Sequence, residues 1–208
     1  MSGFFITLEG GEGAGKSTQI PRIKDFLEHT GRKVLCLREP GGTPVAEKIR
    51  DILKTPDAMD RLCDKTELLL MYAARAQLVE TLIKPKLAEG FDIICDRHDL
   101  STLAYQGGGR GMSNADIAAV RGVALGTFRP DLTFLLDLDP LEGMKRARSR
   151  GSLDRFERSE ASFFERVRAT YLAYAAKHPQ EVKVIDAAQT EDLVFSEIRK
   201  ALEMLYAV

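Results

Sequence analysis

Short apolar segments alternate with longer amphipathic stretches along this chain. The apolar segments lie at 4–8, 33–37, 92–95, 132–138 and 182–185, and each is short enough to form a buried strand. Helical patterns separate them, and such alternation is typical of a parallel sheet with helices on both faces. The pattern therefore predicts a single α/β domain over residues 1–208, built on a five-stranded parallel sheet.

Other segments predict the elements between the strands. Helices are expected at 18–28 and 191–206, and the polar stretch 55–64 is expected to be a loop. The longest helical stretch covers 65 to about 89, where Pro85 should kink or break the helix because proline lacks a backbone N–H. The glycine-rich stretch 107–111 is more typical of a flexible connection than of a phosphate site.

Composition narrows the class of function. The formal net charge of −1 gives no overall attraction to nucleic acid or to an anionic membrane. No apolar run approaches the length of a membrane span, and the N-terminus lacks a basic-then-apolar signal pattern. The three cysteines are odd in number and widely spaced, which argues against a disulfide framework or a metal cluster. We expect a cytoplasmic protein.

Residues 10–17 read GGEGAGKS and fit the phosphate-binding loop (P-loop) pattern G-x-x-x-x-G-K-[ST]. The glycines let the backbone wrap around phosphates at a helix N-terminus, Lys16 can reach the outer phosphates, and Ser17 can ligate magnesium. The alternative is an accidental glycine-rich turn, which the strand before and the helix after disfavour. The residues expected to bind the nucleoside triphosphate are Gly10, Gly11, Glu12, Gly13, Ala14, Gly15, Lys16, Ser17 and Thr18.

A second constellation follows the third apolar segment, where Asp96, Arg97 and His98 stand in a row. An acid at the carboxyl end of a strand beside the P-loop can hold magnesium, and the neighbouring arginine can bind a second phosphate group bidentately. A structural Asp–Arg pair is the alternative. A hydrolytic motor would more often place a second acid here, so the arginine favours transfer to a phosphorylated acceptor.

Basic residues are dense at 145–158, where Arg146 and Arg150 share one helical face and Gly151 allows a break before Arg155. This segment predicts a lid whose arginines close over the transferring phosphoryl group. Arginines in such a role supply about 10³–10⁵ in rate. A solvated charged helix is the alternative interpretation of the same pattern.

In order and spacing these motifs resemble those of the bacterial thymidylate kinases, over essentially the whole chain. The resemblance is carried by 5–17, 38–43 (REPGGT), 72–75 (YAAR), 96–98 (DRH) with Ser101, 104–106 (AYQ) and 146–157. It implies a P-loop NTPase fold with a lid, and transfer of the γ-phosphoryl group of ATP to dTMP to give dTDP. It also implies a Mg²⁺ cofactor and a homodimer, for which the 65–89 helix is a candidate interface.

The resemblance assigns phosphate-binding roles position by position. Lys16 and the loop amides would hold the ATP phosphates, and Arg97 would contact phosphate between the two nucleotides. Arg38 would bind the dTMP phosphate beside a pocket wall formed by Glu39 and Pro40. The magnesium candidates are Ser17, Asp96 and Glu9, although Glu9 is equally explained as a structural acid.

The acceptor nucleoside is assigned in the same way. Arg75 would hydrogen-bond the thymine carbonyl edge. Glu12 would accept a hydrogen bond from the sugar 3′-hydroxyl, and Tyr105 would crowd the 2′ position and disfavour ribose. The polar lining around the base would be Ser101, Thr102 and Gln106.

Two positions modify this resemblance. Eukaryotic relatives carry an arginine where this chain has Gly13, so the lid arginines Arg146, Arg150 and Arg155 become the expected source of transition-state charge. The family usually places a stacking phenylalanine where this chain has Met71, whose thioether can still pack on a ring face. Alternatively, Met71 fills core and Tyr72 takes the stacking role.

Rival functions remain open at this point. A kinase for another nucleoside monophosphate would carry the same loop. A GTP-dependent switch should carry an Asn-Lys-x-Asp motif, and the sequence has none. A motor or DNA-dependent ATPase fits poorly with the near-neutral charge and the lone Asp96-Arg97 pair.

Overall fold

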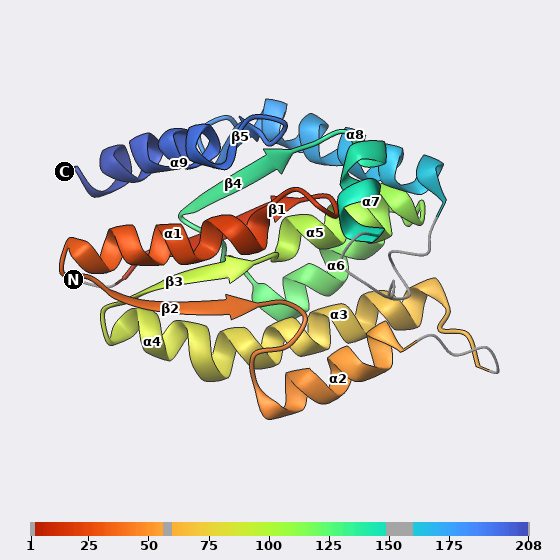
Figure 1. The fold of residues 1–208 in the computed structure, drawn as a ribbon. Helices are drawn as coiled ribbons and strands as arrows, with labels where there is room; N and C mark the ends of the chain where they lie inside the picture. Colours follow the sequence, from red (N-terminus) through yellow and green to blue (C-terminus); the bar gives the residue numbers. More distant parts are fainter. Residues whose placement is uncertain (1–2, 56–59, 149–159, 208) are drawn as a thin grey trace.

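The computed structural model describes residues 3–55, 60–148 and 160–207 (Figure 1). Within these ranges all strands are parallel and form one sheet in the order β2-β3-β1-β4-β5. The five-stranded parallel sheet predicted from the sequence is confirmed, with each boundary within one residue except the carboxyl end of β1. The strands are β1 (Phe5–Gly10), β2 (Lys33–Arg38), β3 (Phe91–Asp96), β4 (Leu132–Asp137) and β5 (Val182–Asp186).

Helices cover both faces of the sheet, as Figure 1 shows. None of the helices in the described part of the chain combines the length and the apolar character that a membrane crossing requires. The α-helices are α1 (Lys16–His29), α2 (Pro44–Lys54), α3 (Asp64–Leu78), α4 (Lys84–Ala88), α5 (Asp99–Thr102), α6 (Asn114–Leu125), α7 (Pro140–Arg148), α8 (Ala161–Lys177) and α9 (Glu191–Tyr206).

Side-chain alternation along β1 sorts the core into layers, because successive residues of a strand point to opposite faces. Ile6 packs with Ile23 of α1 and Ile198 of α9. Phe5 packs on the other face with Leu68 of α3 and Ile117 of α6. Burial of one such side chain contributes about 1.5–3 kcal/mol. The central strand is therefore apolar on both faces near its start, as a parallel sheet requires.

Pro85 does not break the long helical stretch. Between α3 and α4 the chain forms a π-helical turn, Val79–Ile83, so that helical structure continues from Asp64 to Ala88. Such turns shift the hydrogen-bond register, and they are a recognised cause of helix kinks. The register shift lies directly before the proline, and the helix ends before Gly90, whose φ is 84°.

The glycine-rich stretch 107–111 is not a flexible connection, which corrects the prediction. It overlaps a second π-helical segment, Leu103–Gly109, that packs against α8. A Cβ on Gly108 would lie 2.0 Å from Thr170 Oγ1, and one on Gly109 would lie 2.3 Å from the Phe163 ring. These glycines therefore allow close packing of two helices.

A buried carboxylate ties together segments that are distant in sequence. Asp92 accepts hydrogen bonds from the Phe4 amide at 2.8 Å, from Arg32 Nη2 at 2.8 Å and from the Tyr206 hydroxyl at 2.8 Å. It is fully buried, whereas the Arg32 side chain is 27% exposed. The start of β3 is thus joined to both ends of the described chain.

Removal of this carboxylate should destabilise the fold. We expect Asp92→Asn to lower the free energy of unfolding by about 1–3 kcal/mol, because Arg32 and two further donors lose a charged acceptor. Urea denaturation measures the change. The control is Asp192→Asn, which removes a surface pair with Arg22 whose acid is 89% exposed; it should change stability by about 0.5 kcal/mol or less. Equal effects would contradict the role given to Asp92.

Candidate active site

The P-loop and the Asp96-Arg97 pair meet because β1 and β3 are neighbours. Leu8 pairs in register with Asp96, so both strands deliver their following residues to the same edge of the sheet. Strand order also reverses around β1, since the chain moves first to β2 and β3 on one side and then to β4 and β5 on the other. Ligands of open α/β sheets bind at the carboxyl ends of strands at such a point.

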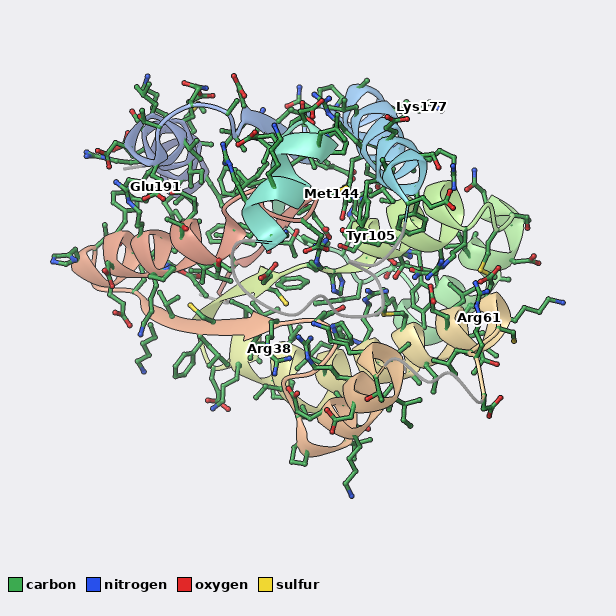
Figure 2. All side chains as sticks on the ribbon, turned by 45° about the vertical axis from the view of Figure 1, so that its right-hand side comes forward. Arg38, Arg61, Tyr105, Met144, Lys177 and Glu191 are labelled. Atoms are coloured by element: carbon green, nitrogen blue, oxygen red, sulfur yellow. The ribbon has the colours of Figure 1, made fainter. Side chains whose placement is uncertain are left out.

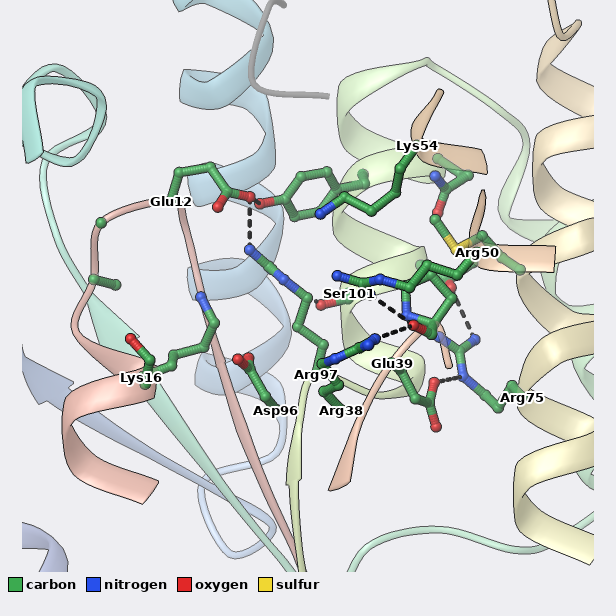
Figure 3. Close-up of a pocket in the computed structure, with 18 of the residues that line it drawn as sticks. Glu12, Lys16, Arg38, Glu39, Arg50, Lys54, Arg75, Asp96, Arg97 and Ser101 are labelled. Atoms are coloured by element: carbon green, nitrogen blue, oxygen red, sulfur yellow. Dashed lines mark hydrogen bonds and ion pairs between the residues drawn. The ribbon is translucent and has the colours of Figure 1, made fainter. Parts of the chain in front are cut away.

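A cavity of about 220 Å³ opens at this edge. Six basic and three acidic side chains line it, so its charge favours anionic ligands. Figure 3 shows Lys16 at one side, Arg75 at the other and Arg97 between them. The structure brings together most of the predicted site residues, namely Glu12, Gly13, Ala14, Gly15, Lys16, Ser17, Arg38, Pro40, Met71, Arg75, Asp96, Arg97, Ser101, Thr102, Tyr105 and Gln106.

The P-loop wraps tightly around the start of α1. Gly13 and Gly15 have φ values of 69° and 88°, which glycine adopts without strain. Lys16 Nζ donates to the carbonyl oxygens of Gly10 and Gly11 at 3.1 and 3.0 Å. Burial lowers the pKa of Lys16, and the charge of Arg97 lowers it further. A bound phosphate chain would place negative charge beside this ammonium group and so stabilise its protonated form.

The P-loop also contacts α7 through two glycines. A Cβ on Gly13 would lie 2.3 Å from the Gly143 carbonyl oxygen. A Cβ on Gly143 would lie 2.2 Å from the Glu12 carbonyl oxygen. The backbone of the loop and the backbone of α7 are therefore in direct contact, and neither position has room for a side chain.

The residues present fit a magnesium ion. Asp96 Oδ1 is buried and has no hydrogen-bond partner among the described residues, and Ser17 lines the same cavity. No cluster of three His, Cys, Asp or Glu side chains suited to a metal occurs within the described ranges. Magnesium in nucleotide sites typically takes one or two protein oxygens and completes its shell with phosphate and water. Asp96 and Ser17 match that donor set.

Glu9 is placed differently from the other magnesium candidates. It does not line this cavity, and it accepts hydrogen bonds from Ser101 Oγ at 2.5 Å, the His98 amide at 2.8 Å and the Tyr171 hydroxyl at 3.0 Å. Burial raises the pKa of its carboxyl group and outweighs these hydrogen bonds and the charge of Arg97. This arrangement favours the structural acid that the sequence left open.

Arg97 stands between the two halves of the cavity. Its φ of 71° is a left-handed conformation that non-glycine residues adopt at a strain of about 1–3 kcal/mol, commonly at functional sites. Arg97 Nη2 donates to Glu12 at 2.7 Å, and the Tyr105 hydroxyl donates to the same carboxylate at 2.9 Å. Burial opposes the charge on Glu12, but Arg97 and Lys16 outweigh it and lower the pKa of Glu12 to about 2. Glu12 is therefore ionised and acts as an acceptor.

Arg75 is fixed at the opposite end of the cavity. Its Nε, Nη1 and Nη2 donate to Glu39 at 2.6 Å, to Thr102 Oγ1 at 2.8 Å and to the His98 carbonyl at 3.0 Å. Glu39 also bonds His98 Nδ1 at 2.7 Å. Burial opposes the charge on Glu39, but Arg75 and His98 outweigh it, so its pKa is lowered. A guanidinium has five N–H donors, so this arginine can bind a ligand while it stays anchored.

Met71 and Tyr72 are adjacent on α3, but their side chains lie in different surroundings. Met71 lines the cavity, whereas Tyr72 is buried, does not line it and donates to Asp99 at 2.7 Å. Successive helical residues point about 100° apart, which separates the two side chains. This placement favours Met71 over Tyr72 for the predicted stacking role.

Sequence reasoning missed two basic residues of α2. Arg50 and Lys54 line the cavity beside Arg38, and Arg50 donates to the Pro40 carbonyl at 2.6 Å. Figure 2 shows Arg38 at the end of β2 and Tyr105 higher in the molecule, and both line the same cavity. The signal was available, because Arg50 and Lys54 are four residues apart and so share a helix face after the REPGGT segment.

Other predicted residues lie outside the cavity. Gly10, Gly11 and Thr18 do not line it. Arg146, on α7, donates to Glu142 at 3.3 Å and to the Ala187 carbonyl at 3.4 Å and also does not line it. Arg150 and Arg155, with most of the predicted lid, lie outside the described residues.

Known proteins match this chain over nearly its whole length. A family model described as thymidylate kinase matches residues 8–198. Thymidylate kinase of Shewanella sp. (strain MR-4) is 55% identical over 202 residues, covering 97% of this chain and 96% of that protein. Its counterpart in Shewanella amazonensis is 52% identical over 201 residues, covering 96% of each.

A solved structure agrees with these relatives. The crystal structure of thymidylate kinase from Ehrlichia chaffeensis superposes with a TM-score of 0.78 at 31% identity, covering 98% of this chain and all of that chain. The chain thus agrees with these proteins in sequence and fold over its whole length. Its P-loop also lines one cationic cavity together with Arg38, Arg75 and Arg97. The chain belongs to the thymidylate kinase family.

Proposed function

We propose that this chain transfers the γ-phosphoryl group of ATP to dTMP and so produces dTDP. The observation that carries the proposal is a single cavity with two cationic ends, Lys16 at one and Arg75 at the other, and with Arg97 and Arg38 between them. A protein that only hydrolyses or binds one nucleotide has no use for the second cationic end. Two phosphorylated substrates placed head to head would use both.

The proposed reaction needs positioning more than covalent chemistry. A phosphate oxygen of dTMP attacks the γ-phosphorus, the bond from that phosphorus to the β,γ-bridging oxygen breaks, and ADP leaves. Lys16 and the loop amides bind the donor phosphates, and Arg97 neutralises charge on the transferring group. Mg²⁺ bound by Ser17 and Asp96 would withdraw charge from the β and γ oxygens.

The acceptor end would recognise the nucleoside. Arg75 would donate to the thymine carbonyl edge, and Met71 would pack on the ring. Glu12 would accept from the 3′-hydroxyl, because its low pKa keeps it ionised. Arg38 and Arg50 would bind the dTMP phosphate from β2 and α2.

The homodimer and the cytoplasmic location remain predictions. Leu69 on α3 is 57% exposed, and Val123 on α6 is 92% exposed. The two helices pack against each other, so each of these neighbouring helices has an exposed apolar side chain that a second copy could cover. This supports the proposed role of α3 in the dimer.

A panel of phosphate acceptors tests the proposed function. We expect kcat/KM for dTMP to exceed that for dUMP about tenfold, which is the usual value of one buried methyl group. UMP should fall further because of its 2′-hydroxyl. CMP should fall further still because its amino group meets the Arg75 donors, and AMP and GMP should be inactive. Preference for any acceptor without thymine would refute the assignment.

Separate variants test the two ends of the cavity. Lys16→Ala should lower kcat about 10²–10³-fold and leave dTMP affinity nearly unchanged, because Lys16 acts on the donor phosphates. Arg75→Ala should raise the KM for dTMP at least tenfold and weaken base discrimination. Steady-state kinetics measure both, and circular dichroism confirms folding of the Arg75 variant. The same kinetic defect in both variants would contradict the separation.

The contact between the P-loop and α7 gives a third test. Alanine normally stabilises a helix relative to glycine by about 1 kcal/mol. Gly143→Ala should instead lower kcat/KM for ATP at least tenfold, because its Cβ would enter the Glu12 carbonyl. The matched control is Gly122→Ala on α6, whose Cβ meets nothing within 4 Å and which should keep full activity. Full activity of Gly143→Ala would mean that the contact has no role.

A further inference from the structure

A second and larger cavity lies on the sheet face that α6 and α8 cover. Its volume is about 710 Å³, and it shares no lining residue with the cavity at the P-loop. Figure 1 shows the short α5 between α6 and α8. Thr7 of β1 and Thr133 of β4 form the floor, where parallel sheets usually carry aliphatic side chains. The sequence therefore leaves this space open and polar.

His98 gives this cavity an unsatisfied hydrogen-bonding group. The residue lines the cavity and is 1% exposed, and its Nε2 has no hydrogen-bond partner among the described residues. Because a carboxylate can only accept, Nδ1 donates its proton to Glu39 at 2.7 Å. Nε2 is then the one ring nitrogen left without a partner in the described structure, and a ligand in this cavity can hydrogen-bond to it.

The floor of the cavity also carries a hydroxyl group that a ligand can bind. Thr7 Oγ1 and Thr133 Oγ1 are 2.8 Å apart and form one hydrogen bond with each other. One hydroxyl donates in that pair, and the other keeps a hydrogen that can be donated to a ligand. The base of the cavity thus provides a ring nitrogen without a partner and a hydroxyl donor.

The charged residues at the rim exclude an anionic ligand. Arg121 Nε donates to Asp99 at 2.5 Å, and its two terminal nitrogens donate to backbone carbonyls. Arg129 pairs with Glu181 at 3.1 Å. With both arginines paired to acids, the rim offers no excess positive charge. The walls include Leu100, Leu103 and Ile117, which suit a flat apolar body.

Two chains of contacts connect this cavity to the acceptor pocket. His98 bonds Glu39, which anchors Arg75 at 2.6 Å. Asp99 accepts from Tyr72 and lies 3.8 Å from Arg75 Nη1. A ligand that fixes the His98 ring would therefore restrict the carboxylate that positions Arg75.

We propose that this cavity is a second binding site for a small uncharged heterocycle with adjacent N–H and N groups, and that its occupancy strengthens acceptor binding through His98, Glu39 and Arg75. The inference goes beyond phosphoryl transfer. Its readouts are binding equilibria, so they do not depend on turnover.

Indazole is a suitable probe, since it is uncharged at neutral pH and carries adjacent N–H and N groups. We expect calorimetry to show indazole binding to the full chain saturated with dTMP. Ala118→Phe fills the cavity from α6 and should weaken indazole binding at least tenfold. The matched control, Ala119→Phe, lies on the same helix but does not line the cavity and should bind like the wild type.

Coupling is measured on the same proteins. Saturating indazole should tighten dTMP binding about fivefold in the wild type, as coupled sites commonly show. This effect should disappear in Ala118→Phe and persist in Ala119→Phe. Thr7→Val, which keeps side-chain volume and removes a floor hydroxyl, should weaken indazole binding about fivefold.

Three results would overturn the proposal. They are displacement of indazole by dTMP, equal indazole binding by Ala118→Phe and Ala119→Phe, and dTMP affinity that does not rise with indazole.

Discussion

Carboxylates that anchor arginines in the cavity wall are the interaction on which the site depends. Glu12 fixes Arg97, and Glu39 fixes Arg75, each through a hydrogen bond of 2.6–2.7 Å. A free arginine side chain carries about 2 kcal/mol of rotamer entropy, which a flexible site would lose on every binding event. Here the fold has already restricted these side chains. Incoming phosphates and bases therefore meet donors that are already oriented, which improves both affinity and geometry.

The features that the sequence predicted well depend on local pattern. Five apolar segments indicated the sheet, and the P-loop motif placed Lys16 and Ser17 correctly in the cavity. The errors arose where tertiary packing decides. Gly108 and Gly109 look like flexible residues in isolation, but α8 packs directly on them. Likewise, only the rotation of α3 in the folded chain shows that Met71 faces the cavity.

The segment after β3 serves two sides of the protein at once. Asp96 and Arg97 line the cavity at the P-loop, while His98 and Asp99 line the second cavity beside α6 and α8. Their backbone also carries hydrogen bonds to Glu9 and Arg75. These four consecutive residues thus separate the two cavities, and a displacement of the segment would change the shape of both. Such a position couples stability and recognition more closely than a surface loop would.

The glycine contact between the P-loop and α7 also bears on how the family diverged. The family resemblance implies an arginine at the position of Gly13 in eukaryotic relatives. In this chain any Cβ at that position would enter the Gly143 carbonyl at 2.3 Å. A single substitution therefore cannot install the eukaryotic arginine here, because α7 would first have to retreat. An arginine in the P-loop and the present contact between the loop and α7 thus exclude each other, and an evolutionary path to such an arginine must pass through changes in both segments.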